Sequence, residues 1–185
     1  MTIHFTSDLH FNHANVIKYC RRPFANVDEM NAALVKNWNR HVNPQDTVYV
    51  IGDFALCRAE LARGFAQRLN GTKHLIAGNH DHSNRKKYAE GQTQGDFQSV
   101  TDIKEIAVGQ QRIVMCHYPM MTWNKSGHGA WMLHGHCHGN LKVDIQSLRL
   151  DVGVDCFNFT PVSFVDVQYI MSKRAFKPDD HHGAD

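Results

Sequence analysis

The stretch TVYVIGD, residues 47–53, sets the organisation of this chain. Its β-branched and aromatic residues form a continuous apolar run of strand length, which is typical of a buried strand in an α/β protein. We interpret this strand as ending at Gly52, so that Asp53 lies just beyond its carboxyl end. Because ligands of α/β proteins bind beyond the carboxyl ends of strands, Asp53 is a candidate functional residue.

The same pattern, an apolar run followed by polar residues, recurs along the chain on both sides of this strand. Residues 2–7, 73–81 and 111–119 also pair an apolar run with polar residues near its end, and residues 97–108 are expected to form further β structure. We expect the polar groups at the strand ends to meet at one rim of the fold. These groups are Asp8, His10, Asp53, Asn79, His80, His117, His136 and His138.

The stretch WMLHGHCHGN, residues 131–140, places histidine at three alternate positions. If the segment is extended, alternate side chains point to the same face, and the three imidazoles can reach one point. A metal site needs such convergence, whereas a core strand does not. Cys137, between two of these histidines, is expected to point away from the site and to be structural.

Helical patterns alternate with the predicted strands. Helices are expected over residues 28–42, with Asp28 as N-cap, and over residues 59–71, with Gly71 as the stop. Ser163 and Asp166 have capping-box spacing at the start of a third helical pattern near the end of the chain. We therefore predict an α/β fold with one domain over residues 1–176 and a polar, disordered tail over residues 177–185.

Composition limits the classes of partner. The formal net charge of +2 gives no bias toward nucleic acid or an anionic membrane surface. Five cysteines, an odd number with no C-x-x-C pair, argue against a disulfide scaffold or a structural zinc finger. With no long apolar run and no signal peptide, we expect a cytoplasmic protein that does not contact membranes.

Five short motifs occur in a specific order: SDLH (7–10), GDF (52–54), GNHD (78–81), CHYP (116–119) and GHCH (135–138). This ordered set resembles the calcineurin-like metallophosphoesterase superfamily. The flanking segments at residues 7–24 and 151–163 are similar to those of its small, single-domain prokaryotic and phage branch. The resemblance implies two packed mixed β-sheets flanked by helices, in a four-layer sandwich.

The resemblance also implies a centre with two divalent metal ions. One ion would take Asp8, His10, Asp53 and His138, and the other would take Asp53, Asn79, His117 and His136. His80 would be a catalytic residue that binds no metal. Asp81 either orients His80 or braces the loop, and we favour bracing. With nitrogen and oxygen ligands, manganese is expected to support activity best, while iron, zinc and magnesium also suit the site.

The implied function is a metal-dependent phosphoesterase that hydrolyses a phosphodiester or phosphomonoester bond by means of a metal-bound hydroxide. The expected substrate is a small phosphate ester such as a nucleotide. Two alternatives stay open. In the first alternative, the chain is a nuclease on single-stranded nucleic acid, which the near-neutral charge does not favour. In the second, it is a catalytically silent scaffold module that binds metal.

Several residues near the motifs keep two interpretations each. Arg21 and Arg22 are candidates for binding a substrate phosphate. Asn12 and His13 either line the substrate side or begin a helix. His134, which the implied ligand set leaves out, is expected to lie in the core or next to the ligands, with a hydrogen bond to a neighbouring strand or to a ligand. Residues 120–129 are expected to form a loop over the site, where Trp123 either stacks on a base or packs.

Overall fold

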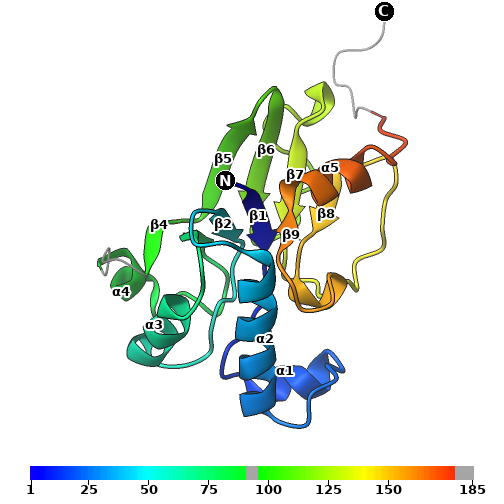
Figure 1. The fold of residues 1–185 in the computed structure, drawn as a ribbon. Coiled ribbons are helices and arrows are strands. Elements are labelled where there is room, and N and C mark those ends of the chain that lie inside the picture. Colours follow the sequence, from blue (N-terminus) through cyan, green and yellow to red (C-terminus); the bar gives the residue numbers. More distant parts are fainter. Residues whose placement is uncertain (91–95, 178–185) are drawn as a thin grey trace, which may run out of the picture.

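The computed structural model describes residues 1–90 and 96–177, and these residues form two β-sheets with helices around them (Figure 1). The first sheet has the strand order β4-β3-β2-β1-β9, and the second has the order β5-β6-β7-β8. The predicted arrangement of two mixed sheets flanked by helices is confirmed. The predicted tail falls at residues 178–185 outside the described part, apart from Lys177.

The first sheet is parallel except at one edge. β1 to β4 run parallel, and β9 pairs antiparallel with β1. Its strands are β1 (Ile3–Thr6), β2 (Thr47–Val50), β3 (Thr72–Ile76), β4 (Phe97–Thr101) and β9 (Val162–Ser163). β2 is buried along its whole length, as its continuous apolar run predicts.

The second sheet contains one antiparallel and two parallel pairings. β5 pairs antiparallel with β6, while β6, β7 and β8 run parallel. Its strands are β5 (Ile103–Val108), β6 (Gln111–Cys116), β7 (Trp131–His134) and β8 (Arg149–Asp151). The β structure expected over residues 97–108 therefore divides between the two sheets, with the chain crossing from one to the other at Asp102.

Two apolar clusters hold the layers together. On one face of the first sheet, Val48 and Val50 pack with Leu34 and Trp38 of α2 (Val27–His41). On the other face, Tyr49 and Ile51 belong to a second cluster, which also contains residues of β6, β7 and α5 (Phe164–Met171). The alternation along β2 thus joins a helical layer to one face of the first sheet and the second sheet to the other.

The helix boundaries differ from two expectations. The N-cap of α2 is Asn26, not Asp28, because the Asn26 side chain accepts a hydrogen bond from Glu29 N and Glu29 in turn accepts one from Ala25 N. Helix α3 (Ala59–Gln67) ends four residues before Gly71. Gly71, with φ of 85°, lies in the turn before β3. Ser163 does cap α5, by accepting a hydrogen bond from Asp166 N.

Two short helices complete the fold, α1 (Ala14–Tyr19) and α4 (Arg85–Glu90). Among the described residues, no helix is long and apolar enough to cross a membrane. Strands β1, β2, β3, β6 and β7 all lead into the polar motifs at their carboxyl ends, so the topology brings the motifs to one edge of the packed sheets.

Candidate metal centre

The seven predicted metal ligands lie in one continuous row of side chains. The distances between neighbouring ligand atoms run from 3.1 to 3.9 Å. In order, the row is His138, Asp8, His10, Asp53, His117, Asn79 and His136. Residues from five separate strand ends thus converge on one site, as the sequence predicts.

Asp53 occupies the middle of the row. Its Oδ2 lies 3.6 Å from His10 Nε2 and 3.5 Å from His117 Nε2, so the same carboxylate faces both halves of the site. Asp81 fixes the backbone there. The Asp81 side chain is fully buried and accepts hydrogen bonds from the backbone N–H groups of Asp53, Phe54 and Gly78. The bracing role expected for Asp81 is confirmed.

In His117 and His138, a hydrogen bond at Nδ1 turns Nε2 toward the site. His117 Nδ1 lies 2.9 Å from the Ile51 carbonyl, which only accepts, so Nδ1 carries a proton and Nε2 faces Asp53. His138 Nδ1 lies 2.7 Å from Asp155 Oδ2, which leaves Nε2 toward Asp8. Such outer contacts hold the tautomer and orientation that a metal ligand needs.

Backbone strain is concentrated at the site. Asp8, His10, Asp53, His136 and His138 have positive φ angles between 48° and 69°, a region that residues other than glycine seldom adopt. The expectation that residues 131–140 are extended is therefore wrong beyond His134, where β7 ends. His136 and His138 reach the site from a turn, because their left-handed backbone redirects the chain after β7.

Three glycines let ligands from different strands approach one another. A Cβ atom on Gly52 would collide with the His117 ring, and one on Gly78 would collide with the Asp53 carboxylate. A Cβ on Gly135 would overlap Ser7 and Asp8. Each glycine precedes a predicted ligand, so close packing explains the residue type at all three positions.

The electrostatics of the site favour a cation. Burial raises the pKa of Asp8 to about 6 and lowers the pKa of His10 to about 2. Burial alone would raise the pKa of Asp53, but its interactions with His117 outweigh burial and lower it to about 2. Burial likewise opposes protonation of His117, but Asp53 raises the pKa of His117 to about 9. The buried carboxylates thus depend on nearby positive charge.

The donor set fits divalent metal ions. His10 Nε2 is buried and has no hydrogen-bond partner among the described residues, although it faces Asp8 and Asp53. A buried imidazole nitrogen without a partner costs free energy, which a bound metal ion would recover. Asp8, His10 and His138 can surround one ion, and Asp8, Asp53 and His117 can surround another. Manganese, iron, zinc and magnesium all accept this mixture of nitrogen and oxygen ligands.

His80 lies beside the row with its ring partly open to solvent. Its side chain is 35% exposed, against 3% for His10 and 0% for His117. The His80 backbone N–H donates to Asp53 Oδ1, and its ring packs edge-on against His10. His80 is therefore held at the centre while its ring faces outward, where a substrate would approach.

His13 lies beside His10 and His80, and Asn12 precedes it in the chain. His13 is the N-cap of α1 but makes no capping hydrogen bond with its side chain. Instead, its ring lies 3.3 Å from His10 at Nδ1 and near the His80 ring. Asn12 is exposed, with φ of 61°, and its backbone N–H donates to Asn31. His13 thus has a helix-start position and a ring that faces the site.

Arg22 does not lie where a substrate phosphate would bind, which corrects the expectation for this residue. Its side chain is fully buried, forms a two-point contact with Asp155, and donates to the carbonyls of Asp8 and Leu9. Arg22 therefore supports the metal centre from the protein interior, through the backbone of Asp8 and through Asp155. The neighbouring Arg21 is exposed, with φ of 53°, and stays a candidate for contact with a phosphate.

His134 and Cys137 lie apart from the row of ligands. His134 is buried at the end of β7, and its Nδ1 lies 2.9 Å from the carbonyl of Gly135. The core role expected for His134 is confirmed, although its hydrogen bond is to the next residue and not to another strand. Cys137 belongs to none of the possible metal clusters within the described ranges.

Asp155 and Tyr118 are two residues of the site that the sequence did not single out. Asp155 binds both His138 and Arg22, and it stands 133 positions from Arg22 in the chain. Tyr118 is 45% exposed, and its ring packs against both His117 and His136. Tyr118 sits within the CHYP motif, so its position after His117 was the available signal. Asp155 lies in the segment 151–163, whose similarity to the family's flanking segment was the available signal there.

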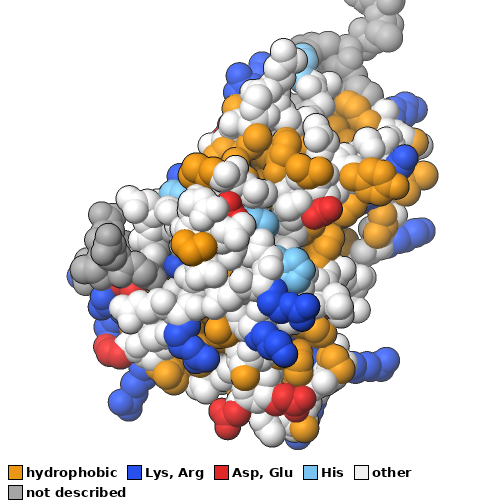
Figure 2. All heavy atoms as spheres, viewed as in Figure 1, with side chains coloured by type: hydrophobic (Ala, Val, Ile, Leu, Met, Phe, Trp, Pro, Cys, Tyr) orange, Lys and Arg blue, Asp and Glu red, His pale blue; other side chains and the backbone are white. Residues whose placement is uncertain are grey.

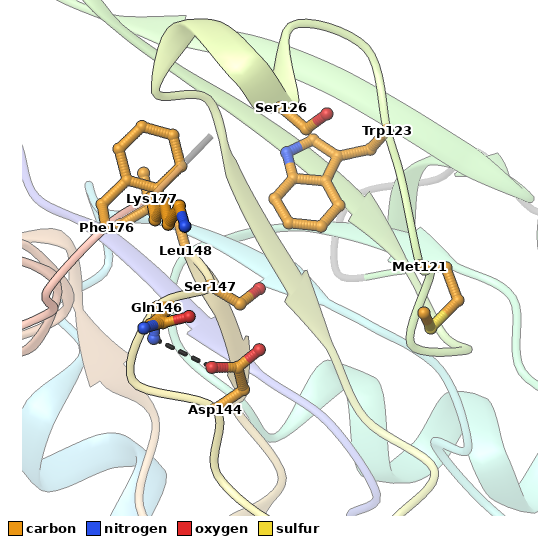
Figure 3. A pocket seen from close by; sticks show the side chains of 9 residues that line it. All are labelled: Met121, Trp123, Ser126, Asp144, Gln146, Ser147, Leu148, Phe176 and Lys177. Carbon is orange, nitrogen blue, oxygen red and sulfur yellow. Dashed lines mark hydrogen bonds between the residues drawn. The ribbon is translucent and has the colours of Figure 1, made fainter. Parts of the chain in front are cut away.

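The loop over residues 120–129 does not bring Trp123 to the metal centre. Trp123 packs against the apolar cluster between the sheets and against the small cluster of Val114, Cys116 and Met132, and its indole N–H donates to the Ala130 carbonyl. Together with Met121 it lines a cavity of about 170 Å³ whose opposite wall comes from residues 144–148 and Phe176 (Figure 3). The packing interpretation of Trp123 is therefore confirmed.

Comparisons with known proteins agree with this fold. The sequence profile of the "Calcineurin-like phosphoesterase superfamily domain" matches residues 1–154. An uncharacterised protein of Methanocaldococcus jannaschii is 36% identical over 178 residues, which cover 92% of each chain. The gene 66 protein of Mycobacterium phage L5 is 27% identical and covers 83% of this chain and 86% of the phage protein.

The structure is also similar to a solved one. The crystal structure of a protein of unknown function from Aquifex aeolicus superposes with a TM-score of 0.73 at 23% sequence identity. The match covers 91% of this chain and 98% of the Aquifex chain, so the two proteins share the whole fold.

Proposed function

The chain belongs to the calcineurin-like phosphoesterase superfamily, and from this premise we propose that it hydrolyses small phosphodiesters at a centre of two divalent ions. The observation that carries the proposal is the position of Asp53, whose Oδ2 lies within 3.6 Å of His10 Nε2 and of His117 Nε2. A carboxylate that faces two ligand sets at once is what a pair of ions about 3.5–4 Å apart requires.

The side chains of the centre have different roles in this reaction. Asp8, His10, Asp53 and His138 would hold one ion, and Asp53, Asn79, His117 and His136 would hold the other. When bound, the two ions neutralise the phosphoryl charge and make water acidic enough to supply the nucleophile. His80, whose ring is the most exposed of those that face Asp53, donates a proton or hydrogen bond to the leaving oxygen.

The surroundings of the centre support a small substrate. In this proposal, the exposed Arg21 and Asn12 and the ring of His13 contact the phosphate or the leaving group of the substrate, for which we expect a nucleotide. Manganese is the ion expected to support activity best, and iron, zinc and magnesium also suit a row of oxygen and imidazole ligands without a thiolate. All five cysteines are free, which supports a reducing, cytoplasmic location.

Hydrolysis of two generic substrates tests the proposal. Protein stripped of metal with a chelator is reloaded separately with manganese, zinc, iron or magnesium, and then given an aryl phosphomonoester or a bis-aryl phosphodiester. We expect metal-dependent turnover of the diester, with manganese most effective. Bound metal without turnover of either ester would contradict the proposal and favour a silent scaffold module. Faster cleavage of single-stranded oligonucleotides than of the diester would favour a nuclease.

A further inference from the structure

A second cavity lies behind the turn that carries His136 and His138. Its volume is about 340 Å³, and its walls come from the segment 139–144, from β8 and from α5. This volume lies within the range of about 300–1,000 Å³ that is typical of small-molecule sites. The predicted ligands of the metal centre do not line it, so the cavity is separate from that centre.

The inner wall of this cavity is apolar. Leu150, Phe157 and Ile170 line it as half-buried side chains, and Leu141 and Val143 extend the apolar surface to the rim. Leu150 and Phe157 also pack against the apolar cluster between the two sheets, so the wall is anchored in the core. An apolar body of a few carbon atoms would gain about 25 cal/mol for each square ångström it removes from water there.

The polar groups of the cavity are arranged to meet an anion. Arg149 and Arg174 each donate one hydrogen bond to a backbone carbonyl, and neither forms an ion pair with a carboxylate in the described part of the chain. The acids on the wall are engaged by backbone N–H groups. Asp151 accepts from Gly139 and Gly153, and Asp144 accepts from Gln146. Lys142 lines the cavity as well, so three cationic side chains stand against the two carboxylates and leave the wall with a net positive charge.

We propose that this cavity binds a small amphipathic monoanion, with a carboxylate or sulfonate head and an apolar body. The head lies between Arg149 and Arg174, and the body lies against Leu150, Phe157 and Ile170. The site is independent of the hydrolysis proposed above and binds its ligand whether or not the metal centre is catalytically active.

Fluorescence of 8-anilinonaphthalene-1-sulfonate, an apolar anion, tests the site in the full-length protein. We expect one probe molecule per chain, displaced by octanoate but not by octyltrimethylammonium. Arg174→Glu is expected to weaken probe binding about tenfold or more, because it replaces an attraction by a repulsion. The matched control is Lys173→Glu, which makes the same reversal of charge at the neighbouring, exposed position outside the cavity. It should change the affinity for the probe less than about twofold.

A second pair of variants tests the apolar wall. Ile170→Trp fills the cavity and is expected to abolish binding, whereas Val165→Trp on the exposed face of α5 should have no effect. This control matters because hydrophobic side chains also gather over α5 on the molecular surface (Figure 2). Three results would overturn the proposal. These are an equal loss of probe affinity in both tryptophan variants, an equal loss in Arg174→Glu and Lys173→Glu, and displacement of the probe by the cation. The absence of probe binding to the folded wild-type protein would overturn it as well.

Discussion

His138 and Asp155 are joined by a contact of 2.7 Å between Nδ1 and Oδ2, at the outer end of the row of metal ligands. The Asp155 carboxylate also receives two hydrogen bonds from Arg22 at 2.8 and 2.7 Å. Burial alone would raise the pKa of Asp155, but His138 and Arg22 lower it, so the carboxylate is ionised and accepts from His138. This relay fixes the His138 ring with Nε2 toward Asp8.

Asp155→Asn is therefore expected to weaken metal binding. The variant removes the negative charge that orients His138, and loss of such an outer partner typically costs about 10–100-fold in metal affinity. Calorimetric titration of metal-stripped protein with manganese measures the effect. Asp28→Asn, an exposed acid on α2, is the control and should bind metal as the wild type does. Equal affinities in Asp155→Asn and wild type would exclude the orienting role.

His80→Ala is expected to lose activity without losing metal. A side chain that assists the leaving group contributes about 10²–10⁴-fold to the rate, and His80 is not needed to complete the proposed ligand sets. Turnover of an aryl phosphodiester and the metal content of the same preparation are measured together. His82→Ala, an exposed histidine two positions away, should leave both unchanged. Loss of metal together with activity would instead make His80 a ligand.

Arg21 and Arg22 are expected to respond in opposite ways despite being adjacent. Arg22→Leu removes the fully buried guanidinium that pairs with the half-buried Asp155 and should lower the free energy of unfolding by about 3–5 kcal/mol. Arg21→Ala, at an exposed position, should leave stability unchanged and raise KM for the diester. Urea unfolding and steady-state kinetics on both variants separate the two effects. A stable Arg22→Leu protein with raised KM would restore Arg22 as a phosphate-binding residue.

Gly135→Ala is expected to disturb the centre through packing alone. The added Cβ would overlap Ser7 and Asp8, and overpacking of this kind typically costs about 1–3 kcal/mol of stability. Because Asp8 must move, the affinity for manganese should fall as well. Gly127→Ala is the control, since a Cβ there would meet no atom within 4 Å. Similar melting temperatures and metal affinities for the two alanine variants would contradict the close approach.

The contribution of Asp46 to stability should disappear in acid. Hydrogen bonds from the backbone N–H groups of Asn43 and Thr2 lower the pKa of Asp46 to about 2, from an ordinary value of 3.8. A depressed carboxyl pKa stabilises the fold above pH 3.8 and ceases to do so as the pH falls toward 2. The difference in urea midpoint between wild type and Asp46→Asn should therefore be constant near neutral pH and shrink below pH 4. A difference independent of pH would argue against ionised Asp46.

Much of the fold and the composition of the site could be read from local patterns. The apolar run of β2, the Ser163 cap of α5 and the polar residues after five strands were visible because each depends on a few neighbouring positions. The predicted positions of the helix ends were less accurate. Asn26 and Asp28 both have side chains that cap helices, and only the backbone geometry, with Glu29 closing the capping box, decides between them.

The sequence by itself determined which residue types stand at the strand ends, since strand periodicity and motif order are local properties. Only the tertiary structure decided how those residues are supported. The turn after His134, the burial of Arg22 and the link from Asp155 to His138 all depend on contacts between segments far apart in the chain. Arg21 and Arg22 look alike in sequence, but packing leaves one in water and gives the other a buried carboxylate, because burial of charge is favourable only where a partner is already in place.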